Sequence, residues 1–426
     1  MASRNRTDLT TDPAPRADEF LRESLESLKT AGLSRKLREL KGAPGPTVSV
    51  NGRQVLMLCS NNYLGITADE RLKQSAKQAI ETFGCGATGS RLISGNLELC
   101  EKLEDTLAAF KGTESALVFT SGYQANVGTV AALAGPGDAI FSDALNHASL
   151  IDGARLSRAE IIIYDHCDAS DLERRMASRP AARRKLILTE SVFSMDGDLA
   201  PLRDVAFLAK KFGALLMVDE AHATGIFGPT GAGCVEALGL GQQVDVQMGT
   251  FSKALGSLGG YIAGTKDLVS YLIHHARSFI FTTGLPPAVL AASTAALEIV
   301  RQEPERRQAL WRYVRQLREG LQTLGFDMGQ EQSQILPLRL GDSHRTMTAC
   351  RYLLKNGVFA QGIRPPTVPD GTARLRLSPM ALHTEQDIEG ALAAFGRLQS
   401  ALSSRKHDFS AACNGAETLA VSAALK

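Results

Sequence analysis

Short apolar runs alternate with amphipathic stretches between residues 116 and 261, and this repeat limits the fold more than any other feature of the chain. The run at 214–218 is apolar throughout, as expected of a strand that is buried on both faces. The stretch before it, 202–212, gathers its apolar residues on one helical face, with Pro201 at its start and Gly213 as its stop. Repeated strand and helix units of this kind predict an α/β fold with a mostly parallel sheet and helices on both sides. The predicted strands before 214–218 are 116–119, 140–141, 161–164 and 186–188.

The pattern changes after Pro287. Residues 288–322 have the periodicity of long amphipathic helices, and the charged stretch 301–307 within them indicates an exposed bend or a junction between two helices. Shorter strands and helices follow in alternation, which predicts a second, smaller α+β domain. Its predicted strands are 335–340, 358–360 and 375–377, and its later helices are 345–356 and 384–402.

The N-terminal part has a different character. Apolar residues recur at helical spacing over 18–40 until Gly42 and Pro44 end the pattern, which predicts an amphipathic helical arm. Strand-like residues at 48–59 surround the turn Asn51-Gly52, a typical hairpin signal. The predicted organisation is an N-terminal arm at 1–60 with a disordered start, a large domain at 61–287, a small C-terminal domain at 288–402 and a flexible tail at 403–426.

Charge and cysteine usage exclude several classes of protein. The 426 residues include 47 lysines and arginines against 45 aspartates and glutamates, so nothing indicates a surface for nucleic acid or for an anionic membrane. Small molecules are therefore the expected partners. The seven cysteines are scattered and never form a C-x-x-C pair, which favours free thiols in the cytoplasm and argues against disulfides or a metal site. No segment has the form of a signal peptide or the apolar length of a membrane span.

Lys253 is the first candidate for chemistry. It stands among small and hydroxylated residues in the stretch 245–260, between an apolar run that stops at Thr250 and another that begins at Tyr261. A lysine whose amine is desolvated loses its charge more easily and then forms Schiff bases with carbonyl compounds. A solvated loop lysine is the alternative, so the interpretation needs partners.

Ligands of open parallel sheets bind at the carboxyl ends of the strands, and polar residues gather there. Asp219 follows the buried strand 214–218, where a carboxylate needs a cation as its partner. Ser121, Gly122 and Tyr123 stand between a predicted strand and a predicted helix, where free backbone N–H groups favour a phosphate. A Schiff-base lysine, a carboxylate for a pyridinium nitrogen and a phosphate cradle are together what pyridoxal phosphate requires.

Two sequence signals point elsewhere and fail on their context. Residues 84–89, G-C-G-A-T-G, have the letters of a dinucleotide fingerprint, but a predicted helix precedes them where the fingerprint needs a strand. Residues 219–222 spell D-E-A-H, the letters of a helicase motif. Helicases also need a Gly-Lys pair to hold the phosphates, and the chain contains none. We therefore interpret the first as a tight glycine turn and reject the second.

From about residue 18 to residue 400 the chain resembles the α-oxoamine synthases, which are pyridoxal-phosphate enzymes of fold type I. Seven motifs in the same order carry the resemblance: S-N-N-Y-L-G (60–65), T-S-G-Y-Q-A-N (120–126), D-A-L-N-H-A-S-L-I-D-G (143–153), E-S-V-F-S-M-D-G (190–197), D-E-A-H-A-T-G (219–225), G-T-F-S-K-A-L-G (249–256) and G-T-A-R-L-R (371–376). The segment 362–376 most resembles the branch of the family that serves biotin synthesis.

The resemblance implies a role for each candidate residue. Lys253 tethers the cofactor and acts as a base, and Asp219 pairs with the pyridine nitrogen. His222 and Ser194 bind the ring hydroxyl, and His147 stacks on the ring. The implied phosphate contacts are Ser121, Gly122, Tyr123 and Thr250, with Thr282 or Thr283 reaching across from a second subunit.

Substrate contacts are implied in the same way. Arg376 would hold the carboxylate of an amino acid, with Asn61, Arg35 and Thr367 as further substrate contacts. Spacing alone does not choose between Arg376 and Arg374, because residues two apart lie on the same face of a strand.

The implied activity joins an amino acid, alanine in the biotin branch, to an acyl thioester such as a pimeloyl group on coenzyme A or on a carrier protein. Decarboxylation accompanies the joining, and the enzyme is expected to be a homodimer. Sister synthases that use glycine or serine, an aminotransferase of related fold and a partner subunit without activity are the alternatives. The intact Lys253 argues against the last of these.

Overall fold

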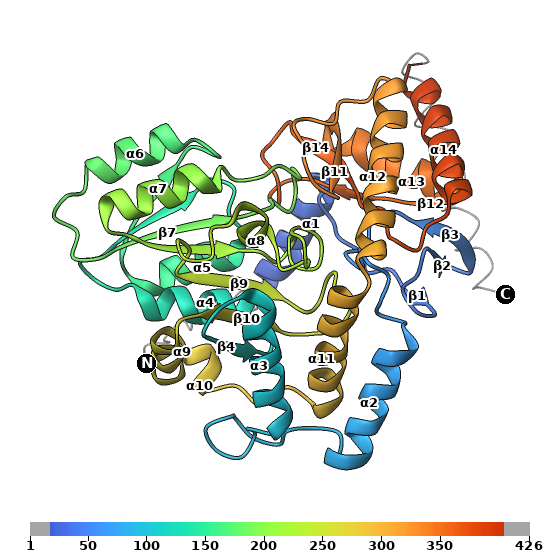
Figure 1. Ribbon diagram of the computed structural model, residues 1–426. Helices are drawn as coiled ribbons and strands as arrows, with labels where there is room; N and C mark the ends of the chain where they lie inside the picture. The colour runs from blue at the N-terminus through green and yellow to red at the C-terminus, as the bar shows by residue number, and fades with distance from the viewer. Residues whose placement is uncertain (1–17, 404–426) are drawn as a thin grey trace, which may run out of the picture.

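The computed structural model describes residues 18–403 and builds them around a seven-stranded sheet (Figure 1). Its spatial order is β4-β10-β9-β8-β7-β5-β6. All strands share one direction except β10, which is antiparallel to both of its neighbours, so the predicted mostly parallel sheet is confirmed. Only residues 251–259 connect β9 to β10, which is too few for the crossover that a parallel return requires. The strands are β4 (Ser115–Phe119), β5 (Ala139–Asp143), β6 (Glu160–Tyr164), β7 (Lys185–Glu190), β8 (Leu215–Asp219), β9 (Val246–Thr250) and β10 (Gly260–Gly264).

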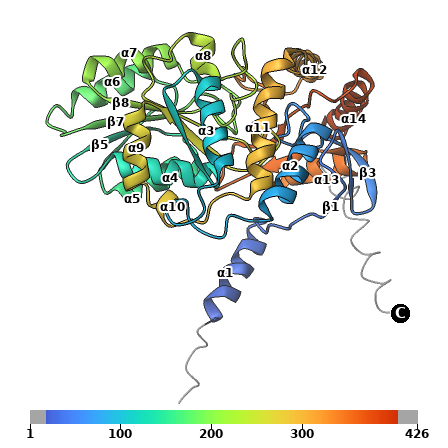
Figure 2. The ribbon, with the colours of Figure 1, turned by 60° about the horizontal axis from the view of Figure 1, so that its bottom comes forward.

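Helices cover both faces of this sheet, because successive strand residues point to opposite sides (Figures 1 and 2). In β4, Val118 belongs to the hydrophobic cluster on one face and Leu117 to the cluster on the other. The first cluster includes residues of α3 (Glu98–Lys111), α6 (Ala169–Ala177), α7 (Leu202–Phe212), α8 (Cys234–Leu238) and α11 (Pro287–Gln302). The second includes residues of α4 (Gly122–Leu133), α5 (Ala148–Ser157), α9 (Lys266–His275) and α10 (Arg277–Ile280).

The C-terminal elements form a second, antiparallel sheet with β14 between β11 and β13. The predicted junction within the charged stretch 301–307 is confirmed, since α11 ends at Gln302 and α12 begins at Pro304. The elements are α12 (Pro304–Thr323), β11 (Leu336–Gly341), α13 (Ser343–Lys355), β13 (Gln361–Ile363), β14 (Ala373–Leu377) and α14 (Glu385–Ser403).

The predicted hairpin is also present. Its strands β2 (Thr47–Val50) and β3 (Arg53–Met57) meet at Asn51 and Gly52, whose φ angles of 51° and 78° are those of a turn that matches the strand twist. β1 (Leu40–Lys41) and β12 (Val358–Phe359) complete a four-stranded sheet in the order β1-β2-β3-β12. Strands of the predicted arm thus pair with a strand of the predicted small domain, and the division into domains stays a prediction.

The helix predicted over 18–40 is too long. α1 spans Glu19–Thr30, and Gly32 with φ 66° follows it in the left-handed region that ends helices. The apolar residues between Gly32 and Leu40 keep the helical spacing although the backbone there is not helical. α1 has no buried residue and projects from the body of the protein (Figure 2). α2 (Glu70–Phe83), in contrast, is the helix predicted before G-C-G-A-T-G; it begins after Asp69, and Gly84 caps its end.

Other predictions concern regions outside the sheets. The predicted disordered start and most of the predicted tail lie outside the described residues. Within residues 18–403 the cysteines are free, and no helix combines the length and apolarity needed to cross a membrane.

Candidate active site

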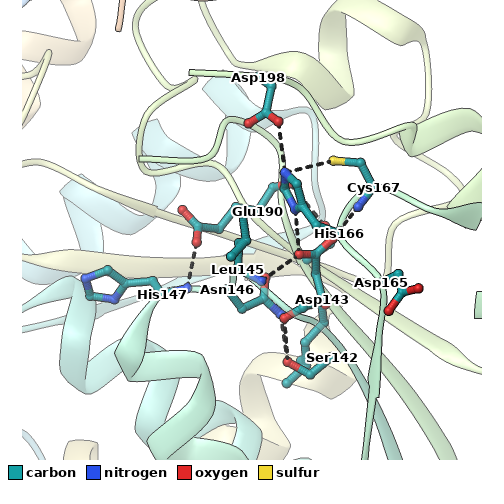
Figure 3. Close-up of polar contacts among 12 residues, drawn as sticks. Ser142, Asp143, Leu145, Asn146, His147, Asp165, His166, Cys167, Glu190 and Asp198 are labelled. Atoms are coloured by element: carbon teal, nitrogen blue, oxygen red, sulfur yellow. Dashed lines mark hydrogen bonds and ion pairs between the residues drawn. The ribbon is translucent and has the colours of Figure 1, made fainter. Parts of the chain in front are cut away.

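The carboxyl ends of the parallel strands bring the predicted residues together. The register pairs Glu190 at the end of β7 with Asp219 at the end of β8, and Asp219 with Met248 of β9. His147, just beyond β5, donates its backbone N–H to the Glu190 carboxylate at 2.6 Å (Figure 3). Burial raises the pKa of Glu190 well above its ordinary value, and the neighbouring Asp219 adds to the effect.

Lys253 lies in the loop between β9 and β10. Burial lowers its pKa to about 8, although the carboxylates of Asp219 and Glu190 oppose the shift. A substantial fraction of this amine is therefore neutral near pH 8, which is the form that attacks a carbonyl carbon and accepts a proton.

Asp219 is buried at 5% exposure, and its carboxylate accepts two hydrogen bonds from neutral groups. Asn126 Nδ2 and the backbone N–H of Ala221 both donate at 2.8 Å. No lysine or arginine of the described residues lies within ion-pair distance of it. A buried carboxylate without a paired cation is costly, so this environment suits a cationic ligand group beside Asp219.

Asn126 and Ser149 also connect Asp219 to His147, and the sequence reasoning missed both. Asn126 Nδ2 donates to Ser149 Oγ at 2.8 Å, and Ser149 Oγ is 2.8 Å from His147 Nδ1. The sequence could have indicated Asn126, because it stands four residues after Gly122 and therefore lies on the same side of α4. The side chain of His147 itself is exposed, which leaves its ring open to a ligand.

The residues predicted to form an anion cradle lie at the N-terminus of α4. Ser121 caps this helix by accepting a hydrogen bond from the backbone N–H of Gln124. Gly122 lies close to β9: a Cβ atom there would meet Met248 Cε at 3.1 Å and Thr250 Cβ at 3.5 Å. Thr250 therefore borders the free N–H groups of the first helical turn. The phenol of Tyr123 bonds to Asp152 instead, so the backbone of Tyr123 is the part available to an anion.

His222 is buried and bonded to Tyr63, a residue that the sequence reasoning did not select. Tyr63 Oη is 2.8 Å from His222 Nδ1 and 3.0 Å from Asn61 Oδ1. Burial, together with the charges of Lys253 and Arg376, lowers the pKa of His222 well below its ordinary value. The neutral imidazole and the phenol form one hydrogen-bonded unit. In the sequence, Tyr63 was only the aromatic residue of S-N-N-Y-L-G.

The two arginines of β14 have different partners. Arg374 forms an ion pair with Asp196. Arg376 donates from Nε to the Ser194 carbonyl at 2.6 Å, from Nη1 to Asn61 Oδ1 at 3.1 Å and from Nη2 to Tyr63 Oη at 3.2 Å. All three acceptors are neutral, so Arg376 is a buried cation that lacks an anion among the described residues. This arrangement favours Arg376 as the group that receives a substrate carboxylate.

Arg35 and Thr367 lie elsewhere. Arg35 lines a cavity of about 680 Å³ between α1 and the Pro365-Pro366 turn. Thr367 follows this turn, and Arg364 before it donates to the carbonyls of Gly32 and Ser34. Among the described residues, no hydrogen bond or ion pair links Arg35 or Thr367 to the strand-end site, and their contact with substrate stays a prediction.

Thr282 and Thr283 line a small cavity with Arg91, Thr120 and Phe279. Thr283 bridges to Ser90 in the turn that follows G-C-G-A-T-G. Their predicted contact with a second subunit is not tested by the single chain.

Residues 53–395 match the family described as aminotransferase class I and II. The chain belongs to this family. Among its curated relatives, a protein of Citrifermentans bemidjiense named 8-amino-7-oxononanoate synthase is 53% identical over 371 residues, which cover 87% of this chain and 95% of the relative. A protein of the same name from Geobacter metallireducens is 51% identical over 374 residues, which cover 87% of this chain and 95% of the relative.

Solved structures of this family have the same fold. A serine palmitoyltransferase from S. paucimobilis with bound pyridoxal phosphate and myriocin superimposes with a TM-score of 0.86 at 35% identity, covering 90% of this chain and 98% of the other. An 8-amino-7-oxononanoate synthase from Francisella tularensis gives a TM-score of 0.70 at 26% identity, covering 81% and 98%. The predicted fold type I is thereby confirmed.

The site residues of this aminotransferase-family chain fit pyridoxal 5′-phosphate on their own chemistry. Asp219 has no ion-pair partner among residues 18–403, and a protonated ring nitrogen would supply one. The cradle at Ser121 and Gly122 suits a phosphate, and the half-buried Lys253 suits an aldehyde.

Proposed function

We propose that the chain is a pyridoxal 5′-phosphate-dependent acyltransferase that condenses L-alanine with a pimeloyl thioester in biotin synthesis. The products are 8-amino-7-oxononanoate, carbon dioxide and a free thiol. One observation carries the choice of reaction: relatives that are 48–53% identical to the chain, over 87–89% of its length, bear the name of this synthase. The geometry supports the cofactor, and the name of the relatives supports the substrates.

When bound, pyridoxal 5′-phosphate supplies an aldehyde that condenses with amines and a ring that absorbs the electron pair left at Cα of the amino acid. The protein supplies the remainder. The carboxylate of Asp219 favours a protonated ring nitrogen and so increases the capacity of the ring to accept electrons. The N-terminus of α4 and Thr250 would hold the phosphate, and the exposed ring of His147 would be free to lie against the cofactor ring.

Lys253 has two tasks in this proposal. Its neutral amine would hold the aldehyde of the cofactor, and once free, Nζ would accept the proton from Cα of alanine. Its pKa of about 8 suits both tasks, since a base works best when its pKa lies near the working pH. The resulting ammonium returns a proton to the same carbon after carbon dioxide has left.

Arg376 holds the carboxylate of alanine, and the loop at Ser194 and the Asn61 side chain fix the direction of its guanidinium. The neutral His222, held through Nδ1 by Tyr63, would offer its other ring nitrogen to the ring hydroxyl, in line with the predicted role of His222. His222 keeps this role over the working pH range because burial holds its pKa low.

A sister activity is the second candidate, because serine palmitoyltransferases superimpose with TM-scores of 0.80–0.86 at 35–36% identity. The higher identity to the synthases favours alanine. To test the choice, the holoenzyme is incubated with alanine, glycine or serine and with pimeloyl-CoA, acetyl-CoA or palmitoyl-CoA, and thiol release is measured. We expect the highest rate for alanine with pimeloyl-CoA. Absence of turnover with this pair contradicts the proposal, and product without carbon dioxide indicates an aminotransferase.

We also propose a cytoplasmic homodimer that accepts its acyl group from coenzyme A or a carrier protein. Free cysteines support the compartment. The exposed apolar side chains of α1, Phe20, Leu21, Leu25 and Leu28, support burial against a second copy. Light scattering is expected to give twice the 45.5 kDa mass of one chain, and a monomer at working concentration contradicts the dimer.

A further inference from the structure

His166, between β6 and α6, lies outside the residues assigned so far. Its Nδ1 is 2.8 Å from Asp143 Oδ1, and its Nε2 is 2.8 Å from Asp198 Oδ2 (Figure 3). Carboxylates only accept hydrogen bonds, so a ring bonded to one at each nitrogen carries a proton on both. Burial alone lowers the pKa of His166, but the bonds to Asp143 and Asp198 dominate and raise it to about 12. The ring is therefore an imidazolium that joins two carboxylates.

A metal site is the alternative for this cluster, because Asp143, His166 and Cys167 lie close enough to share an ion. The distances argue against it. Two ligand atoms about 2.0–2.2 Å from a tetrahedral zinc lie about 3.4 Å apart. The 2.8 Å between His166 Nδ1 and Asp143 Oδ1 is shorter, and is a hydrogen-bond length.

On one side the imidazolium fixes the turn that carries His147. Asp143 ends β5, and its two carboxylate oxygens accept the backbone N–H groups of Leu145 and Cys167 at 2.9 Å. The next residues are held too: Asn146 Nδ2 donates to the Leu188 carbonyl at 2.9 Å, and His147 donates its N–H to Glu190. These bonds leave the backbone at 143–147 little freedom.

On the other side the imidazolium fixes the loop between β7 and α7. The Asp198 carbonyl accepts the N–H of Phe193, and the His166 ring packs edge-on against Phe193 at 4.4 Å. This loop carries Ser194, whose carbonyl accepts Arg376 Nε. One imidazolium thus connects the loop of His147 with the loop that directs Arg376.

We propose that His166 is a positioning residue: with Asp143 and Asp198 it forms an ionic clamp that holds His147 over the cofactor and Ser194 against Arg376. The inference rests on the proposed function for its catalytic consequence. The effect of the clamp on the rigidity of the two loops can be measured without substrate.

The test compares His166→Gln, Asp198→Asn and the double variant with the wild-type chain. Hydrogen exchange of the apoenzyme, read by mass spectrometry on peptides covering 143–150 and 191–199, is expected to speed up in each. Because His166 and Asp198 act as a unit, the double variant is expected to exchange like His166→Gln rather than faster. Two controls are expected to exchange like the wild type: His344→Gln, an exposed histidine on α13, and Cys167→Ala, which keeps the backbone N–H that Asp143 binds.

Activity gives the second readout. In the holoenzyme, His166→Gln is expected to lower kcat about ten- to a hundredfold, because misplacement of a catalytic group costs rate. The visible absorbance and circular dichroism of the bound cofactor are expected to change, while Cys167→Ala keeps both. Should His166→Gln fail to fold, Asp198→Asn carries the test, since Asp198 is half-buried and asparagine conserves its volume.

Unchanged exchange at 143–150 and 191–199 in His166→Gln overturns the clamp, and so does stoichiometric zinc in the wild type that Cys167→Ala loses. Failure of the wild type to turn over alanine with pimeloyl-CoA refutes the proposed function instead, and leaves the exchange result intact.

Discussion

Arg376 gives the sharpest test of how the substrate is held. Replacement by methionine keeps an apolar stem of similar length and removes the guanidinium. The residue is 6% exposed, and its described acceptors are all neutral, so the only anion assigned to it is the carboxylate of the amino acid. Loss of a buried, charge-assisted pair costs about 2–4 kcal/mol. At 1.4 kcal/mol for each factor of ten, kcat/KM for alanine is expected to fall roughly 30- to 700-fold.

Arg374→Met is the matched control on the same strand. It breaks the ion pair with Asp196 and leaves that partly buried carboxylate with only its longer contact to Arg339 at 3.4 Å, so we expect the free energy of unfolding to fall by about 1–3 kcal/mol. Arg376→Met removes a buried cation that has no anion, and we expect a smaller loss of stability. The opposite is expected for substrate binding, where Arg374→Met leaves the KM for alanine nearly unchanged.

The assays are thiol release against alanine concentration and urea unfolding of the apoenzymes. An Arg376→Met variant with wild-type kcat/KM refutes the assignment of the carboxylate. A larger effect on alanine in Arg374→Met than in Arg376→Met reverses it. If Arg376→Met lowers kcat/KM for alanine but both variants lose the same free energy of unfolding, the claim that only Arg374 has an anionic partner in the protein is contradicted.

Three further predictions follow from buried charges. Lys253 becomes neutral above its pKa of about 8, so the rate at which the apoenzyme binds pyridoxal 5′-phosphate is expected to rise with pH. Stopped-flow absorbance is expected to place the midpoint of this rise near pH 8. A midpoint near 10.5, the ordinary pKa of lysine, contradicts the prediction. The raised pKa of His166 stabilises the fold fully below the ordinary value of 6.5 and progressively less as pH rises toward about 12. Between pH 7 and 10 the wild type is therefore expected to lose at most about 1.4 kcal/mol of unfolding free energy per pH unit relative to His166→Gln. Urea unfolding energies of the two proteins that change in parallel with pH refute this prediction. Lys111→Met removes the ammonium that lies 2.5 Å from the buried Glu220 carboxylate, so the free energy of unfolding in urea is expected to fall by about 3–5 kcal/mol. Lys73→Met, in the exposed pair with Glu70, is expected to change this free energy little.

The strand-end residues could be predicted from the sequence because local patterns define them. A buried strand followed by Asp219, and a strand, a glycine turn and a helix at Ser121, place their groups at one edge of a parallel sheet. The register of β7, β8 and β9 then brings Glu190, Asp219 and Met248 side by side.

Residues whose role depends on distant partners could not be found in this way. Tyr63 contacts His222 across 159 positions, and Asp196, the anion that distinguishes Arg374 from Arg376, is 178 positions from Arg374. His166 meets Asp143, at the end of β5, and Asp198, in the loop after β7, at separations of 23 and 32 residues. No local period encodes such contacts, and for the same reason spacing left the choice between the two arginines open.

The predicted length of the N-terminal helix was wrong for a different reason. The apolar spacing of 18–40 is helical throughout, but the backbone leaves the helix before Gly32, and α1 has no buried contact that would extend it. Where packing does not favour one conformation, a single glycine decides the end of the helix.

The central claim is that the site is organised around Lys253, and mass spectrometry of the borohydride-reduced holoenzyme tests it most directly. We expect one phosphopyridoxyl group per chain, on the peptide that contains Lys253, and none in Lys253→Ala reduced in the same way. A modified lysine at another position, or the same modification in Lys253→Ala, contradicts the account.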